Sequence, residues 1–473
     1  MQFSKTDFIH YLKCPKSLWL LKHKPNIYPY GEFSDYAKKI SAEGYEVEKY
    51  AQTLLSAQPD ADTYSFQSIF QTERGLYARA DVTRDNGDGT INIYEIKSST
   101  SVKRGSQHNQ IKDAAFQKIA AIEAGAKVAS IFIVHLNKHY VRECEIIPQE
   151  LLVIEDVTSE VADVEAETRT EIEQAMAILG QQEIDENSCT CLTLTKSNHC
   201  DAFDYFNPDI PKPSIYNLPR ISKAKIAGFI ADGLFNLNEI ELGEVTEKQA
   251  LVLKSAQSNE PVIDQTVLAE FYSKAKYPIY FLDYETYSSA IPLVDGARPQ
   301  APIPFQYSLH VKRTPDEMNL LHHEYLAEDA AMPLALIKHM QNNIDATGSV
   351  VSWHAAFENT QNKNMAEFYP DMADFLNGLV ERTLDLEDLF KEGYVDIAFG
   401  GSTSIKKVLP VLAPDLTYDG MDVASGTDAM EAWARFINMS VGAEKDQLRD
   451  AMLEYCKLDT YAMVRIFEEI KRV

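Results

Sequence analysis

Strand-like and helical patterns alternate through the first 205 residues. Residues 75–82 and 90–97 are strand-like and flank Asn-Gly and Asp-Gly pairs, which suit the positive φ angles of a hairpin turn. An alanine-rich helical pattern over residues 113–124 is followed by a short apolar run over residues 130–136, which is typical of a buried strand. This order predicts an α/β domain.

The last two hundred residues show a different order. We expect three strands, then a helix and a further strand, and then helices to the C-terminus; these elements fall at residues 279–286, 305–312, 319–325, 329–342 and 349–353. The order predicts an α/β domain with a ribonuclease-H-like sheet. A strong helical pattern covers residues 448–473.

Prolines separate these two regions. Residues 207–213 contain three prolines, which interrupt both helices and strand ladders, so we place the domain boundary there. Short helical patterns follow at residues 221–237 and 246–256. They suggest a small helical connector, and a structural spacer is favoured over a DNA-binding module. The predicted parts are a first domain at 1–205, a connector at 206–270 and a last domain at 271–473.

Composition places the chain among ordinary globular proteins. Its 473 residues are enough for about three domains of ~150 residues. No apolar stretch approaches the ~20 residues of a membrane helix, and the N-terminus lacks the pattern of a secretory signal. We therefore expect a cytoplasmic protein that does not span a membrane. In that compartment the six cysteines would be thiols or metal ligands.

The net charge bears on possible partners. Forty-five basic and 71 acidic residues give a formal charge of −26, which argues against a protein that coats nucleic acid. The charge is uneven, because acidic residues crowd into a helical pattern at 155–173 while basic residues gather in residues 1–40 and around Lys97. A solvated face is the ordinary interpretation of each run.

The first cluster of candidate catalytic residues lies on the predicted hairpin. Glu95 and Lys97 are two apart on one strand and share a face, and Asp81 stands on the partner strand. Two carboxylates suit Mg²⁺, and a neighbouring ammonium can orient water or neutralise a phosphate. A solvent-facing strand edge could carry the same residues, so this pattern alone does not establish a nuclease site.

Three of the six cysteines form a second candidate cluster. Cys189, Cys191 and Cys200 lie in a segment rich in Thr, Ser and Asn, which has no reason to be buried core, so ligation explains them economically. Cys14 is the candidate fourth ligand. Four thiolates suit either a 4Fe-4S cluster or Zn²⁺. The remaining two, Cys144 and Cys456, are expected to be ordinary buried thiols.

A second acidic set lies in the last domain. Asp283 and Glu285 share one face of a buried strand, and burying acids costs several kcal/mol unless a cation compensates. Tyr455 and Asp459 are four apart and share a helical face. Sites of this kind use two metal ions about 4 Å apart, and the tyrosine can hold the attacking water.

The hairpin motif resembles the RecB-type branch of the PD-(D/E)xK nucleases, which have a restriction-endonuclease-like fold. The resemblance implies that Gln117 is the motif glutamine, although Ala121 stands where the family has a tyrosine. It also implies a metal ligand on an upstream helix, where this chain has Glu48. Cysteines bracketing the motif resemble the iron-sulfur RecB-like nucleases of CRISPR adaptation and of AddB-type helicase-nucleases. The bracketing favours 4Fe-4S over Zn²⁺.

The second acidic set resembles the DnaQ-like DEDD 3′–5′ exonucleases in their tyrosine variant. That resemblance implies a middle acidic ligand after the strand at residues 349–353, where Glu358 replaces the family aspartate and Asp385 is the alternative. The implied catalytic and metal-binding set is Asp283, Glu285, Glu358, Tyr455 and Asp459.

Nearly the whole chain resembles a bacterial family of fused RecB-like and DnaQ-like nucleases. The resemblance implies Mg²⁺- or Mn²⁺-dependent hydrolysis of DNA at both sites, single-stranded and 3′ to 5′ at the second, in DNA repair or in defence. The alternatives are RNA trimming and a nucleic-acid-binding adaptor with decayed sites. Residues 401–407 are a candidate phosphate contact. No GxxxxGK[ST] motif supplies a motor, and no helicase or repair partner is identifiable.

Overall fold

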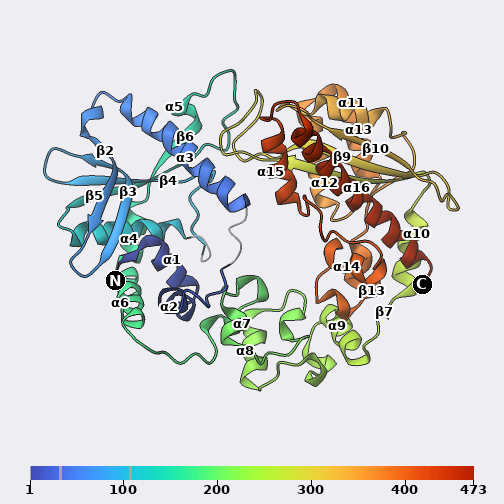
Figure 1. Ribbon diagram of the computed structural model, residues 1–473, viewed down its shortest axis with the longest axis horizontal. Coiled ribbons are helices and arrows are strands. Elements are labelled where there is room, and N and C mark those ends of the chain that lie inside the picture. The colour runs from blue at the N-terminus through green and yellow to red at the C-terminus, as the bar shows by residue number, and fades with distance from the viewer. Residues whose placement is uncertain (1, 31–34, 106–108) are drawn as a thin grey trace. The chain divides into compact units, whose positions relative to one another are not determined.

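The structure, a computed structural model, describes residues 2–30, 35–105 and 109–473 (Figure 1). The chain divides into two compact units. The N-terminal unit comprises Met1–Asp209 and Ser288–Ala301, and the C-terminal unit comprises Ile210–Tyr287 and Pro302–Val473. The connector expected at 206–270 therefore packs almost entirely as part of the C-terminal unit. The link between the first two strands of the last predicted domain packs as part of the N-terminal unit.

The N-terminal unit is built on a six-stranded mixed sheet of order β1-β3-β4-β5-β6, with β2 also paired to β3. Only β1–β3 and β4–β5 are parallel pairs. Its strands are β1 Phe3–Ser4, β2 Tyr64–Gln71, β3 Leu76–Asp85, β4 Ile91–Ile96, β5 Val128–Leu136 and β6 Leu152–Asp156. Its helices are α1 Lys5–Lys13, α2 Pro15–His23, α3 Asp35–Ser56, α4 Gln110–Glu123, α5 Pro148–Leu151, α6 Thr158–Leu179 and α7 Phe203–Phe206.

Both faces of this sheet are buried. On β4, Tyr94 joins the apolar cluster that contains Val47 of α3, whereas its neighbour Ile93 joins the cluster that contains Ala114 of α4. Successive strand residues point to opposite faces, so α3 and α4 cover the two sides. The parallel pairing of β4 and β5 requires a crossover, which α4 supplies.

The C-terminal unit contains a five-stranded sheet of order β10-β9-β8-β11-β12. Strands β8, β9 and β10 are antiparallel neighbours, and β11 and β12 run parallel to β8. Its strands are β7 Val262–Ile263, β8 Ile279–Tyr287, β9 Ile303–Lys312, β10 Leu321–Leu326, β11 Ser349–Ser352, β12 Thr383–Asp385 and β13 Tyr394–Val395. Its helices are α8 Lys223–Ala231, α9 Glu247–Ser258, α10 Gln265–Lys274, α11 Leu334–Gln341, α12 Ala356–Phe368, α13 Ala373–Glu381, α14 Ile405–Leu412, α15 Gly426–Phe436 and α16 Ala443–Lys471.

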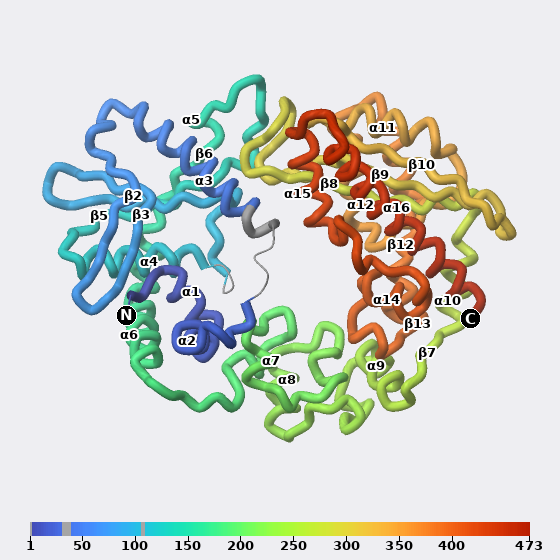
Figure 2. Tube along the Cα trace, in the orientation of Figure 1, coloured from blue at the N-terminus to red at the C-terminus, as the bar shows by residue number. Residues whose placement is uncertain are grey.

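Alternation along β8 decides where its acids point. Phe281 packs in the cluster that holds Phe467 of α16, and Leu282 packs in the opposite cluster with Leu336 of α11. Asp283 and Glu285 continue the series of Phe281, so they face α16. The connector belongs to this unit structurally, because α9 packs beside β13 (Figure 2), and a short β13–β7 ladder pairs Tyr394 with Ile263.

The predicted α/β class is confirmed as two units with mixed sheets and covering helices. Two expected helices are shorter than predicted. The helix expected at 329–342 begins at Leu334, directly after Pro333, and the one expected from 221 ends at Ala231, before Gly233 adopts a φ of 74°. Among the helices that the structure describes, none combines the length and apolar character needed to cross a membrane.

Candidate functional site

Glu95 is the centre of the first site. Its side chain is 2% exposed, and it contacts the ammonium groups of Lys97, at 2.8 Å, and of Lys5. The amide of Gln117, which is buried on α4, donates to the other carboxylate oxygen. Burial alone would raise the pKa of Glu95, but the charges of Lys97 and Lys5 outweigh it and lower the pKa to about 2. Glu95 is thus an anion poised beside Gln117.

Asp81 lies next to Glu95 on the neighbouring strand. One of its carboxylate oxygens accepts the backbone N–H of Ile96 at 2.8 Å. Burial, followed by the negative charge of Glu95, raises the pKa of Asp81 to about 7. Two adjacent buried carboxylates with opposed pKa shifts form a donor set for a hard cation, whose charge would favour the ionised form of both.

Lys97 lies one residue beyond the end of β4. Its ammonium also binds the carboxylate of Asp113 on α4 at 2.9 Å, and the two acids raise its pKa against the effect of burial. Lys5 and Asp113 are site residues that the sequence analysis missed. Lys5 is 90 positions from Glu95 in the sequence, and neither Lys5 nor Asp113 belongs to the motif that drew attention to the hairpin.

Glu48, the metal ligand that the resemblance implies, lies on α3. Its carboxylate accepts hydrogen bonds from Gln52 and from Gln67 of β2. Gln67 stands opposite Asp81 in the β2–β3 ladder, between the Phe66–Val82 and Ser68–Ala80 pairs. Among the described residues, no three metal-ligand side chains that include Glu48 come within ligating distance. The hydrogen bonds of Glu48 thus go to Gln52 and Gln67 and not to Asp81 or Glu95.

The four predicted thiols come together. Cys14, between α1 and α2, meets Cys189, Cys191 and Cys200, with all four sulfur atoms within 4.8 Å of one another and all four side chains buried. The amide of Asn207 donates to the sulfur of Cys189 at 3.5 Å. Four converging sulfur atoms from two distant segments form a group that could bind a metal.

The other two cysteines differ from each other. Cys144 was expected to be buried, but it is exposed, at a positive φ of 59° in a loop, so that prediction is wrong. Cys456 is fully buried on α16, as expected. Its sulfur lies within 4.8 Å of carboxylate oxygens of Asp283 and Glu285, a proximity that the sequence pattern did not reveal.

The second site contains four carboxyl groups, from β8, α12 and α16, whose charges act on one another. Burial and then the charges of Asp459, Glu285 and Glu358 raise the pKa of Asp283 well above its usual value. Burial, with Asp459 as the largest charge effect, does the same for Glu285. Asp459 on α16 has a pKa raised to about 6 by burial. Crowded buried acids of this kind resist ionisation unless cations compensate.

Glu358 and Asp385 have different roles in the structure. Glu358, in the first turn of α12, is buried, and its Oε2 has no hydrogen-bond partner among the described residues. Burial raises its pKa to about 8. Asp385 instead uses Oδ1 to accept the backbone N–H groups of His354 and Glu387, at 3.0 and 3.1 Å. Glu358 is therefore the freer candidate ligand, and Asp385 holds the loop before α12.

Two tyrosines and a lysine surround Asp459. Tyr455, one turn earlier on α16, is placed to hydrogen bond its carboxylate. Tyr418, from the segment between α14 and α15, donates to Oδ1 at 2.7 Å. The ammonium of Lys406 lies 5.3 Å from the ring centre of Tyr418 and 5.4 Å from that of Tyr455. Tyr418 was not predicted, because a tyrosine in an irregular segment carries no periodic signal.

The helix α15 begins against Glu285. A Cβ atom at Gly426, its first residue, would lie 3.5 Å from Oε2 of Glu285. A second close approach fixes residues 400–404, because a Cβ at Gly401 would lie 1.9 Å from the backbone oxygen of Asn217 in the connector. Gly401 has a φ of 77°, and Asn217 also donates to the carbonyl of Gly400 at 2.7 Å. Glycine is therefore required where the connector meets this loop.

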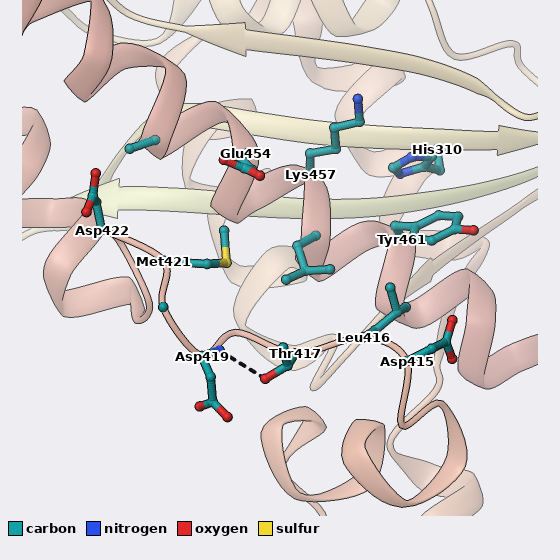
Figure 3. Close-up of a pocket in the computed structure, with 13 residues that line it drawn as sticks. His310, Asp415, Leu416, Thr417, Asp419, Met421, Asp422, Glu454, Lys457 and Tyr461 are labelled. Atoms are coloured by element: carbon teal, nitrogen blue, oxygen red, sulfur yellow. Dashed lines mark hydrogen bonds between the residues drawn. The ribbon is translucent and has the colours of Figure 1, made fainter.

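Two pockets flank the second site within the C-terminal unit. One, of about 760 Å³, lies between the loop at 415–422 and the face of α16 that carries Glu454, Lys457 and Tyr461 (Figure 3). The same loop carries Tyr418, which reaches Asp459 on the buried face of α16. The other pocket, of about 720 Å³, is lined by connector residues, by His354 and by residues 401–403.

Comparisons with known proteins place part of the chain. Residues 280–404 match a domain of unknown function, DUF2779. The span contains Asp283, Glu285 and Glu358 and ends before α16. The chain is 26% identical over 243 residues to the uncharacterized protein MG366 of Mycoplasma genitalium, covering 47% of this chain and 36% of that protein. It is 29% identical over 217 residues to the Mycoplasma pneumoniae homolog of MG366, covering 41% and 32%.

The chain thus spans about a third of the length of these curated relatives. No solved structure gives a significant match.

Proposed function

We propose that the chain is a metal-dependent nuclease with two active sites that hydrolyse phosphodiester bonds, most readily of single-stranded DNA. The observation that carries the proposal is the proximity of Asp283 and Glu285 of β8 to Asp459 of α16 and Glu358 of α12, whose charges act on one another, with the pKa of each raised by burial. A protein gains nothing in stability from four crowded carboxyl groups, whereas two divalent cations would neutralise them.

The order of the C-terminal sheet supports a ribonuclease-H-like, DnaQ-type domain for this site. In such a domain the acids lie near the carboxyl ends of the parallel strands. In this chain Glu285 lies near the carboxyl end of β8, and Glu358 follows the end of β11. Mg²⁺ or Mn²⁺ held there would activate water and stabilise the leaving oxygen. Tyr455 and Tyr418 orient the Asp459 carboxylate, and Tyr455 is placed to position the attacking water. We expect 3′ to 5′ exonuclease activity.

The N-terminal unit is proposed to be a second hydrolytic centre with a restriction-endonuclease-like fold. Asp81 and Glu95 would hold the cation, and Gln117 orients Glu95 through its amide. The ammonium of Lys97 donates a hydrogen bond to Glu95 and lies one residue beyond the end of β4, where it could also bind a phosphate. Glu48 acts, on this proposal, through Gln67.

The four-thiol group is proposed to hold a 4Fe-4S cluster, with Zn²⁺ as the alternative. The sulfur donors fit either group. Cys14 precedes α2 and the other three cysteines follow α6, so a bound cluster would join the two ends of the N-terminal unit. Its expected role is therefore structural.

The test of the C-terminal site uses the full chain with Mn²⁺ and matched DNA and RNA oligonucleotides, each labelled at the 5′ end. A stepwise ladder that shortens from the 3′ end is expected on DNA, and it should disappear in Asp283→Asn but persist in the control Asp371→Asn, an exposed aspartate after α12. If RNA is shortened faster than DNA, the preferred substrate is RNA, which is the RNA-trimming alternative. Binding without any product would support the adaptor alternative and contradict the nuclease.

A further inference from the structure

Lys406 is a lysine next to Tyr418 and Tyr455, the two tyrosines that surround Asp459 in the second site. It lies in the first turn of α14, and its ammonium rests over the rings of Tyr418 and Tyr455, at 5.3 and 5.4 Å from their centres. It also donates to the backbone oxygen of Ala424 at 2.6 Å. An ammonium has three protons, so this contact leaves donors for a further oxygen ligand.

The surroundings of Lys406 are acidic but hold no close ion-pair partner for it among the described residues. Its positive charge opposes the rise in the pKa values of Glu285 and Asp459. The contacts of its ammonium among the described residues are with Ala424, Tyr418 and Tyr455, and none is an ion pair. A half-buried lysine near Glu285 and Asp459 that makes no direct ion pair can bind another anion. Lys338 of α11, in the same unit, is an exposed lysine outside residues 401–407.

The segment that presents Lys406 is held firmly. Trp353 donates to the carbonyl of Thr403 at 3.1 Å, and Thr403 binds Glu387 through its hydroxyl. The Gly401–Asn217 contact described above fixes the same turn from the connector side. Lys406 therefore projects from a rigid backbone, which is the arrangement that positions a charged group precisely for a ligand.

We propose that Lys406 is a phosphate-binding residue of the C-terminal site, which holds a backbone phosphate of the nucleic-acid strand beside the acids. This inference rests on the proposed function. It explains how an anionic strand can bind at a site lined by acids in a chain of net charge −26, because Lys406 supplies a positive charge there. The two tyrosine rings hold the ammonium by cation–π contact until the phosphate oxygen arrives.

The test compares Lys406→Met, Lys406→Arg and the control Lys338→Met, at an exposed lysine of α11 outside residues 401–407. Each variant is made in a chain that also carries Lys97→Ala to silence the first site. Binding of a fluorescent single-stranded oligonucleotide is measured by anisotropy in Ca²⁺, which supports binding while slowing hydrolysis. KM and kcat are then measured in Mn²⁺, and Mn²⁺ affinity and Tm are measured without DNA.

Lys406→Met is expected to weaken oligonucleotide binding about tenfold, the cost of one charge-assisted hydrogen bond. The slope of log Kd against log salt should fall by about 0.7, which corresponds to one phosphate contact on a single strand. KM should rise more than kcat falls, Lys406→Arg should restore most of the binding, and Lys338→Met should behave as the parent. Mn²⁺ should bind Lys406→Met at least as tightly as the parent, because a positive charge beside Glu285 is gone.

Two results would overturn the inference while the proposed function stands. In one, the parent binds and cuts DNA, and Lys406→Met equals Lys338→Met in KM and salt slope. In the other, Lys406→Met loses Mn²⁺ affinity and several degrees of Tm, and Lys406→Arg fails to restore binding, which would make Lys406 a structural tie to Ala424. A wild-type chain that neither binds nor cuts the oligonucleotide refutes the proposed function and the inference together.

Discussion

The hydroxyl of Tyr418 donates a hydrogen bond to Oδ1 of Asp459 at 2.7 Å. The two residues come from separate elements, since Tyr418 lies between α14 and α15 and Asp459 lies in the middle of α16. Burial raises the pKa of Asp459 to about 6, and the bond from Tyr418 opposes that rise. The second site thus has two tyrosines on one carboxylate, where the helix motif predicted one.

Tyr418→Phe should lower the activity of the C-terminal site about tenfold, since a hydrogen bond to a charged group contributes about 1.5–3 kcal/mol. Asp459 must be ionised to hold a cation, and loss of the donor raises its pKa. The acidic limb of the pH–rate profile should therefore move to higher pH. The control Tyr461→Phe, on the pocket face of α16 (Figure 3), should leave the limb in place. If the acidic limb of the pH–rate profile stays in place in Tyr418→Phe, Tyr418 does not control the ionisation of Asp459.

Removal of metal should make the stability of the C-terminal unit fall as pH rises. Burial raises the folded-state pKa of Glu358 from 4.5 to about 8, so the folded state holds this proton more tightly than the unfolded state. Its stabilising contribution is complete below about pH 4.5 and is lost as pH rises toward 8. In EDTA, the Tm should drop between pH 5 and 8, and Mn²⁺ should reverse the drop.

The variant Glu358→Gln isolates this effect, because a neutral amide of similar shape cannot ionise. Its Tm in EDTA should be less sensitive to pH, although Asp283 and Glu285, whose pKa values are also raised, leave a residual slope. Differential scanning calorimetry across the pH range measures both proteins. A wild-type Tm that is constant or rises from pH 5 to 8 in EDTA would show that Glu358 is not buried among acids.

The cysteines supply a prediction about metal content. Anaerobically purified protein should contain about four iron atoms per chain and absorb near 400 nm, as a 4Fe-4S cluster requires. Cys191→Ser should lose most of that iron, and Cys144→Ser should retain it, because Cys144 is exposed and lies outside the four-thiol group. Metal analysis and the visible spectrum decide the matter. A colourless protein that contains one zinc atom per chain would show that the four thiols bind Zn²⁺ and not a 4Fe-4S cluster.

The sequence predicted local features of the fold well. The hairpin of β3 and β4 and the three antiparallel strands β8 to β10 appear where alternation, apolar runs and Gly-containing turns indicated them. The pairings within short motifs also followed from spacing alone. Glu285 shares the face of Asp283, and Tyr455 lies one helical turn from Asp459, because strand and helix periods impose these neighbours.

Contacts between distant segments could not be predicted in this way. Lys5 meets Glu95 across 90 positions, and the segment Ser288–Ala301 packs in the N-terminal unit although it joins two strands of the other. Neither follows from a local period, because which helix covers which face depends on the whole fold. Cys144 was misjudged for a related reason, since its exposure depends on a loop that no pattern describes.

The most direct test of the central claim, two separate hydrolytic sites in one chain, is digestion of end-labelled single-stranded DNA in Mn²⁺. Wild type is compared with Asp283→Ala, Lys97→Ala and the double variant, and Glu95→Gln provides a second disruption of the first site. We expect each single variant to lose a different part of the product pattern and the double variant to lose all products. Full activity in the double variant, or no cleavage of DNA or RNA by wild type, would contradict the claim.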